Sequence, residues 1–220
     1  MTIYHPTPCC QIPSLAEFYD ETFGAKTNGL FVEVGAYDGR TVSNTAFLAD
    51  LGWRGLYIEP VPEYAAVCAA NHGKRVKVLN AAIGATDGEV DIYVGDVFST
   101  GLRSQRDLYA GLEWSQKSHA TECKITVGQF RLDTVLGATD IKPGFELLVV
   151  DVEGMEDQVF AGFDLAKWLP KMVIVELEDF HPDFKNIPKV VERCTGIRRL
   201  MADNGYDERF CDHINTVFVR

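Results

Sequence analysis

The chain alternates between short apolar runs and stretches in which apolar residues recur every three or four positions. Most of the runs are nearly unbroken, which is typical of strands buried on both faces. The runs lie at residues 30–34, 56–59, 75–80, 146–150 and 172–176. The helix-period stretches lie at residues 41–51, 63–71, 156–161 and 188–204. This alternation predicts a mostly parallel sheet with helices on both faces.

Weaker patterns predict the remaining elements. Residues 89–94 alternate between apolar and polar, which predicts a half-exposed strand, and residues 125–127 are expected to form an edge strand. Residues 132–136 predict a short helix. Residues 206–211 and 216–219 predict a C-terminal antiparallel hairpin that completes a seven-stranded sheet.

The length and patterning predict one α/β domain over residues 1–220. Residues 1–28 are expected to form an N-terminal extension with a helix at 15–23. Residues 95–124 are rich in Gly, Ser, Arg and Gln and have little periodicity, which predicts an insertion or substrate lid.

The first strand leads into a loop with two glycines. Glu33 lies near the end of the strand, Gly35 and Gly39 follow, and the second strand ends at another carboxylate, Glu59. Glycines let the backbone approach a ligand, and an acid at the tip of the neighbouring strand can accept both ribose hydroxyls. The pattern therefore predicts a pocket for a nucleotide-like cofactor.

The glycine spacing separates the possible cofactors. Dinucleotide folds use G-x-G-x-x-G, whereas this sequence has E-x-G-x-x-x-G and no Walker-type lysine after it. Glu33 and Asp38 would repel a pyrophosphate but suit the sulfonium and ammonium groups of S-adenosylmethionine (SAM). The alternative is that these segments are ordinary buried strands and glycine turns of some other α/β protein. That alternative explains one strand that ends at an acid more easily than two. We therefore expect SAM.

Polar residues stand at the ends of five predicted strands. Because ligands of open α/β sheets bind beyond the carboxyl ends of the strands, these residues predict one working cleft. They are Glu33, Glu59, Asn80, Asp151 and Glu176.

The composition of the chain limits the classes of binding partner that we expect. A formal net charge of −11 disfavours binding to nucleic acid and to anionic membranes. The sequence shows no signal peptide and no apolar run long enough to span a bilayer, and its six cysteines are scattered without a C-x-x-C pair. These features predict a cytoplasmic protein with reduced thiols and no membrane insertion. They do not indicate an oligomeric state.

Several sequence blocks, in order from about residue 29 to residue 178, resemble the FkbM family of SAM-dependent methyltransferases. The blocks are FVEVGAYDG at 31–39, SNT at 43–45, GW at 52–53, YIEP at 57–60, NAAIG at 80–84, LDTVL at 132–136 and DVEG at 151–154. The resemblance implies a Rossmann-like class I methyltransferase fold. It also implies methyl transfer from SAM to an oxygen, commonly the hydroxyl of a sugar, glycan or small natural product.

The resemblance also implies a role for each matching position. Glu33, Gly35 and Gly39 would frame the methionine part of SAM, and Glu59 would bind the ribose. Asn80 and Ala81 would lie near the adenine, and Asp151 close to the reacting methyl group. The further cofactor-binding residues expected in these blocks are Ala36, Tyr37, Asp38, Ser43 and Pro60.

A sugar hydroxyl is a weak nucleophile, so it needs a base or a metal ion. The expected catalytic residues are Asp151, Glu176 and His181, and a Mg²⁺ ion could be bound by Asp151, Glu176 and Asp179. Three alternatives remain open: methylation of nitrogen, methylation of a carboxyl group, and a SAM-binding module without turnover.

Overall fold

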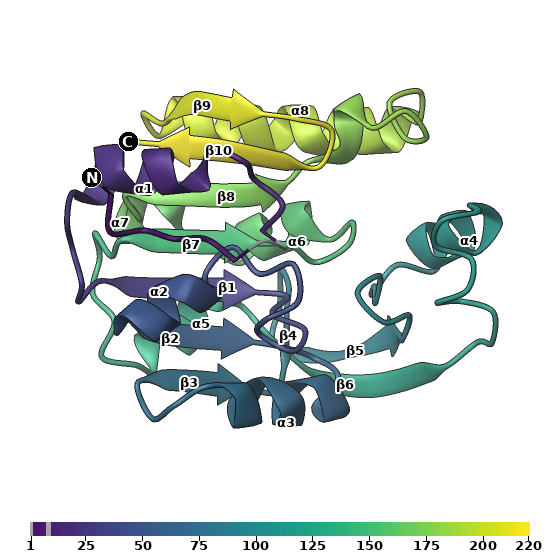
Figure 1. Cartoon of the computed structure of the whole chain (residues 1–220). Helices are drawn as coiled ribbons and strands as arrows, with labels where there is room; N and C mark the ends of the chain where they lie inside the picture. Colours follow the sequence, from purple (N-terminus) through teal and green to yellow (C-terminus); the bar gives the residue numbers. More distant parts are fainter. Residues whose placement is uncertain (1, 8–9) are drawn as a thin grey trace.

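The computed structural model describes residues 2–7 and 10–220, which form an α/β fold (Figure 1). The described residues build a seven-stranded sheet with the order β3-β2-β1-β7-β8-β10-β9. Its first five strands in that order are parallel, and β10 runs antiparallel to both β8 and β9. The strands are β1 (Leu30–Val34), β2 (Arg54–Ile58), β3 (Val76–Leu79), β7 (Leu147–Val150), β8 (Met172–Glu176), β9 (Asp207–Cys211) and β10 (Asn215–Val219). The predicted parallel sheet and closing hairpin are confirmed.

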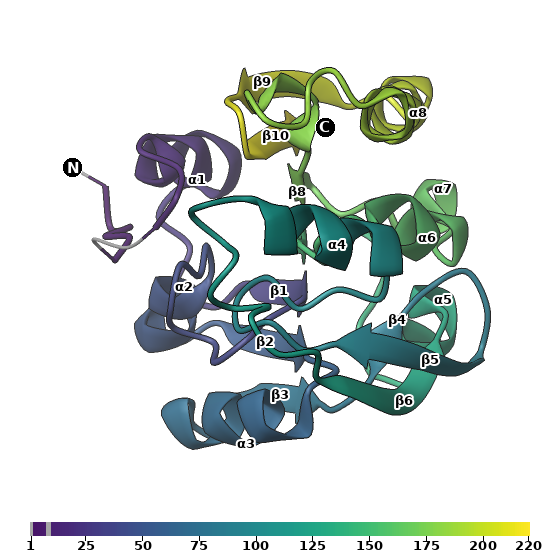
Figure 2. The same ribbon diagram turned by 90° about the vertical axis from the view of Figure 1, so that its right-hand side faces the viewer.

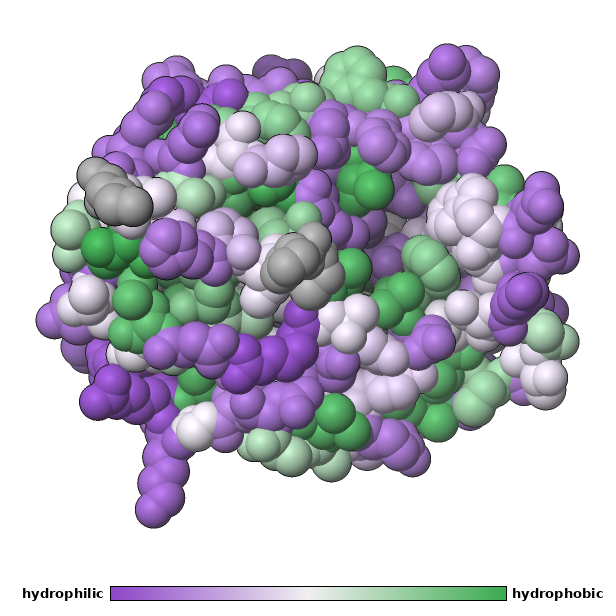
Figure 3. All heavy atoms as spheres, viewed as in Figure 1, coloured by the Kyte–Doolittle hydropathy of each residue, from purple (hydrophilic) through white to green (hydrophobic). Residues whose placement is uncertain are grey.

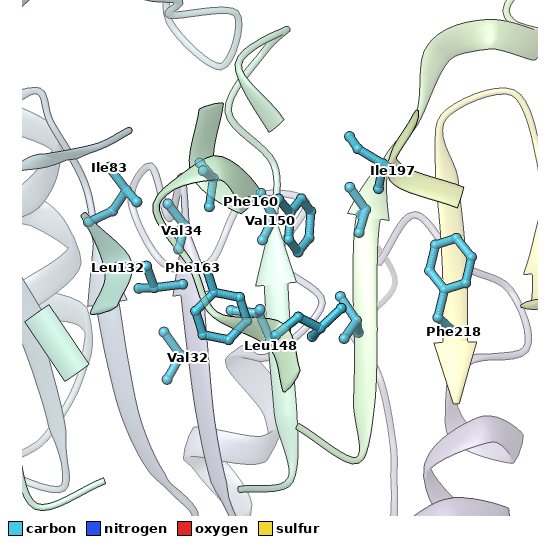
Figure 4. Close-up of a cluster of buried hydrophobic side chains, with 14 of the residues drawn as sticks. Val32, Val34, Ile83, Leu132, Leu148, Val150, Phe160, Phe163, Ile197 and Phe218 are labelled. Atoms are coloured by element: carbon cyan, nitrogen blue, oxygen red, sulfur yellow. The ribbon is translucent and has the colours of Figure 1, made fainter. Parts of the chain in front are cut away.

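Helices cover both faces of this sheet. One face packs against α1 (Leu15–Phe23), α2 (Ala46–Leu51) and α3 (Pro62–Asn71). The other packs against α5 (Leu132–Gly137), α6 (Glu156–Ala161), α7 (Leu165–Trp168) and α8 (Pro188–Asp203). Successive residues of β7 therefore enter different cores, Leu147 on the first face and Leu148 on the second. Figure 4 shows Leu148 within the second core. Burial on both faces explains the unbroken apolar runs in the sequence.

A second, three-stranded sheet was not predicted. It consists of β4 (Ala82–Ile83), β5 (Gly88–Tyr93) and β6 (Lys124–Phe130), with β6 in the centre. The prediction of an edge strand at 125–127 is therefore wrong, because this strand is the central one of its sheet and extends over Lys124–Phe130. β4 spans only two residues and alternate residues of β6 are exposed, so neither strand gives a strong hydrophobic signal.

Two helices also differ from the prediction. The stretch at 41–51 is helical only from Ala46, because Val42 has a positive φ of 50° and the Ser43 hydroxyl accepts hydrogen bonds from the following backbone amides. The insertion at 95–124 contains α4 (Arg103–Gly111). Figure 2 looks at the carboxyl ends of the parallel strands and shows α4 lying across them.

Within residues 2–7 and 10–220, no helix combines the length and the apolar character needed to cross a bilayer. The face seen in Figure 3 mixes hydrophilic and hydrophobic residues. Of the six cysteines, Cys9 lies outside the described residues, and Cys68, Cys123, Cys194 and Cys211 are unbridged thiols.

Candidate active site

Strand register places four of the five predicted strand-end residues along one edge of the sheet, whereas Glu33 lies inside β1, two residues before Gly35. Val34 pairs with Ile58 and with Val150, Ile58 pairs with Leu79, and Val150 pairs with Val175. The next residue of each strand therefore falls in one row at the carboxyl edge. That row consists of Gly35, Glu59, Asn80, Asp151 and Glu176.

A cavity of about 330 Å³ lies beyond this row. Its volume is within the range of small-molecule sites. The predicted site residues that line it are Glu33, Gly35, Ala36, Tyr37, Ser43, Glu59, Pro60, Ala81, Asp151, Glu176 and His181. The insertion lines it as well, through residues 96–99, Gly101, Tyr109 and Trp114.

Gly35 is required by a close backbone contact. Its φ is +88°, and a Cβ atom at this position would lie 1.6 Å from the carbonyl oxygen of Asp151. Its amide donates a hydrogen bond to the Ile58 carbonyl at 2.9 Å. The loop after β1 therefore lies between the ends of β2 and β7, where a side chain would not fit.

Four predicted site residues do not line the cavity. Asp38 folds the loop on itself, because its carboxylate accepts hydrogen bonds from the amides of Arg40 and Thr41 and from the Thr41 hydroxyl. Gly39 packs on α3, where a Cβ atom would lie 2.7 Å from Cys68 Sγ.

The amide of Asn80 is also used within the chain. Its Nδ2 donates to the carbonyls of Glu59 and Pro60, both at 2.9 Å, so it holds the turn that follows β2. Asp179 lies in the 3-10 turn after β8 and pairs with Arg198 at 3.0 Å. The expected metal set of Asp151, Glu176 and Asp179 is therefore not assembled.

Two buried carboxyls, those of Glu33 and Glu59, line the side of the cavity formed by β1 and the end of β2. Glu59 accepts hydrogen bonds from the amides of Tyr37 and Val61, each at 2.8 Å, and burial raises its pKa to about 7. Glu33 accepts a hydrogen bond from the Thr45 hydroxyl, and burial raises its pKa to about 8. A cationic ligand beside these groups would favour their charged forms.

On the other side of the cavity lies an acid cluster, formed by Asp151, Glu153, Glu156, Glu176 and Glu178. The four glutamates are buried. Burial, with the neighbouring carboxyls, raises the pKa of Asp151 to about 6 and the pKa values of Glu153 and Glu176 well above the usual range. A carboxyl with a pKa near 6 is suited to accept a proton at neutral pH.

The insertion supplies two hydrogen-bond donors that the sequence analysis missed. The Tyr109 hydroxyl donates to the Glu153 carboxylate, and the Gln105 side-chain amide donates to Glu178 at 3.2 Å. Both donors are buried on α4 and stand four residues apart, on one face of the helix. The four-residue spacing of Gln105 and Tyr109 is the sequence signal that could have identified them. The segment contains few apolar residues, so its helix is hard to recognise from periodicity.

His181 packs against two aromatic side chains, those of Phe184 and Trp114, which also line the cavity. Its ring is 4.8 Å from that of Phe184 and 5.6 Å from that of Trp114, measured between centroids. Burial lowers its pKa, which favours the neutral imidazole. Trp114 donates from Nε1 to Asp183 at 2.9 Å, so the insertion and the loop after β8 meet here.

The comparison with protein families matches the Methyltransferase FkbM domain to residues 33–208. A comparison with curated protein sequences gives no significant match.

Among solved structures, the chain resembles an O-methyltransferase from Bacillus cereus in complex with SAH. The identity is 13%, the alignment covers 97% of this chain and 84% of that one, and the TM-score is 0.52. A putative O-methyltransferase from Klebsiella pneumoniae has 12% identity, coverage of 99% and 83%, and a TM-score of 0.53. A putative caffeoyl-CoA O-methyltransferase from Staphylococcus aureus has 11% identity, coverage of 97% and 85%, and a TM-score of 0.53. These likenesses identify the fold as that of class I SAM methyltransferases, as predicted.

Proposed function

Since the chain belongs to the FkbM family of methyltransferases, we propose that it transfers the methyl group of SAM to a hydroxyl oxygen of a sugar, glycan or small natural product. The observation that carries this proposal is the cavity itself, because one space is lined both by the loop that follows β1 and by residues of the acid cluster. A donor bound on one side would have its methyl group facing carboxyl groups on the other.

The donor side offers chemistry that matches each part of SAM. Glu33 provides a carboxyl for the ammonium group, and Glu59 provides carboxylate oxygens for the ribose hydroxyls. Ala81 and the β4 residues Ala82 and Ile83 provide an apolar wall for the adenine ring. Gly35 allows the backbone itself to approach the ligand.

Methyl transfer needs alignment and a proton acceptor. The new O–C bond forms as the S–C bond breaks, and the sulfur leaves as a neutral thioether, so the cofactor supplies the activated group. The hydroxyl proton passes to Asp151, whose pKa of about 6 keeps it largely ionised at neutral pH. Glu176 and His181 line the same cavity and are the alternative acceptors.

The acid cluster favours a hydroxyl acceptor over the alternatives. A hydroxyl holds its proton strongly, so a nearby base is required, whereas a carboxylate acceptor would be repelled by this cluster. The net charge of −11 supports a small molecule or glycan rather than a nucleic acid as the partner. An amine acceptor remains the second candidate, because the same carboxylates would attract it.

Calorimetric titration tests the donor. We expect SAM to bind and NAD to give no heat, and binding of NAD alone would overturn the assignment. Formation of S-adenosylhomocysteine from SAM with panels of hydroxyl and amine compounds then tests the acceptor class. Turnover with amines only would replace O-methylation by N-methylation, and SAM binding without any turnover across both panels would favour a binding module.

Variants test the base. Asp151→Asn should keep SAM binding and reduce turnover by about a hundredfold or more, the lower range of general-base effects. Asp179→Asn is the matched control, since Asp179 is also an acid beyond a strand end but pairs with Arg198 outside the cavity. Equal turnover in both variants would remove Asp151 from the mechanism.

A further inference from the structure

Three carboxylates in the acid cluster come close enough to share one ligand. Asp151, Glu153 and Glu176 each offer one oxygen atom, and these atoms all lie within 4.8 Å of one another. We call this set the carboxylate triad. All three residues line the cavity, so the triad is open to a ligand that enters there.

Glu176 provides an independent sign that this arrangement is suited to a ligand. Its residue is only 9% exposed, and its Oε2 atom is buried without a hydrogen-bond partner among the residues the structure describes. A buried carboxylate oxygen without a partner costs free energy, so such atoms are rare in folded proteins. A bound cation would satisfy this oxygen.

The chain supplies too little positive charge to balance the cluster. In the described part of the chain, the basic group paired with it is Arg193, which faces Glu156 at 3.4 Å and Glu178 at 3.5 Å. The carboxylate triad has no such ion pair among the described residues.

The opposite edge of the same sheet shows a buried acid that the chain does neutralise. Glu146 precedes β7 and is equally buried, at 9% exposed. It pairs with Lys26 at 2.7 Å and with Lys171 at 3.1 Å, and it also accepts the Leu30 amide. Two lysines thus form ion pairs with one carboxylate there, whereas no described residue forms an ion pair with the carboxylate triad.

The backbone holds Glu153 in place at some cost. Its φ is +54°, in the left-handed region that residues with a side chain seldom adopt. The Thr100 hydroxyl fixes its carbonyl at 2.7 Å, and the Tyr109 hydroxyl donates to its carboxylate. Two groups from the insertion therefore keep this third carboxylate beside the ends of β7 and β8.

We propose that the carboxylate triad binds one divalent cation of the type that prefers oxygen ligands, such as Mg²⁺ or Mn²⁺. Oxygen atoms from three carboxylates are a hard ligand set, and Mg²⁺ leaves its other positions to water or substrate. This inference rests on the proposed function, because the cation would hold the acceptor oxygen opposite the methyl group and make its hydroxyl more acidic.

Titration of the whole, chelator-treated protein with Mn²⁺, followed by electron paramagnetic resonance, tests the site without any turnover. We expect one bound Mn²⁺ per chain that excess Mg²⁺ displaces. Glu176→Gln and Glu153→Gln should each weaken Mn²⁺ binding by about tenfold or more. Asp179→Asn should bind Mn²⁺ as the wild type does.

Parallel measurements separate the possible failures. Mn²⁺ should raise the melting temperature of the wild type and not that of Glu176→Gln, which also reports whether the variant is folded. If the wild type binds SAM but no Mn²⁺, or if both Gln variants bind Mn²⁺ normally, the metal site is overturned and the proposed function stands. If Mn²⁺ binds the triad and SAM does not bind, the metal site stands and the proposed function fails.

Discussion

Glu33→Gln should change how the stability of the ligand-free protein depends on pH. Glu33 is 5% exposed, and its pKa is raised from 4.5 to about 8 by burial. The folded state therefore holds this proton more tightly than the unfolded state. Its contribution to stability is present at low pH and is lost as the pH rises from about 4.5 to about 8.

The size of the effect follows from these two pKa values. Each pH unit between them costs about 1.4 kcal/mol of the free energy of unfolding. The cost is about 1 kcal/mol at pH 5 and about 3 kcal/mol at pH 7 as an upper limit. Gln has a similar shape and does not titrate, so the stability of Glu33→Gln relative to wild type should rise by roughly 2 kcal/mol between these pH values.

Urea unfolding of both proteins at pH 5, 6, 7 and 8 measures this difference. Using the change with pH removes the constant cost of burying the Gln amide beside Thr45. Glu63→Gln is the control, because Glu63 is exposed on α3 and should show no such trend. If the stability difference between Glu33→Gln and wild type is the same at pH 5 and pH 7, the reasoning about a buried, protonated Glu33 is wrong.

Four further changes test the loops after β1 and β2 and the aromatic group around His181. Gly35→Ala should prevent folding or cost about 3 kcal/mol or more, because its Cβ would lie 1.6 Å from the Asp151 carbonyl; an unchanged thermal melt would contradict this. Glu59→Ala should weaken SAM binding by roughly 1–3 kcal/mol in calorimetry, whereas Asn80→Ala should mainly lower stability, since its amide donates to the backbone carbonyls of Glu59 and Pro60. Trp114→Ala should raise the KM for the acceptor and leave the SAM affinity unchanged; a selective loss of SAM binding would place Trp114 on the donor side.

Much of the sheet could be predicted because burial on both faces leaves a strong signal. Continuous apolar runs mark β2, β7 and β8, and the polar residue that ends each run marks its carboxyl end, whereas Glu33 interrupts the apolar run of β1. Strands that are parallel and in register must present those residues in one row, so Glu59, Asp151 and Glu176 could be placed at the cavity from the sequence.

The contributions of other residues depend on backbone geometry that no pattern reveals. Glu153 turns into the cavity because its φ is positive, whereas Asp179 turns toward Arg198 within a 3-10 turn. Nothing in residue type or spacing distinguishes the two acids. Gln105 and Tyr109 reach the acid cluster from a helix whose exposed faces are polar, so tertiary contacts rather than periodicity determine their positions.

The insertion enters and leaves the domain through the second sheet alone. Its two ends continue from β5 and β6, which pair antiparallel from Gly88↔Gln129 to Tyr93↔Lys124. Deletions, additions or exchanges between these ends leave every hydrogen-bonded pair of the seven-stranded sheet intact. The residues of the insertion that line the cavity can therefore be exchanged without breaking the pairing of that sheet, and chimeras spliced at Tyr93 and Lys124 are the natural way to make such exchanges.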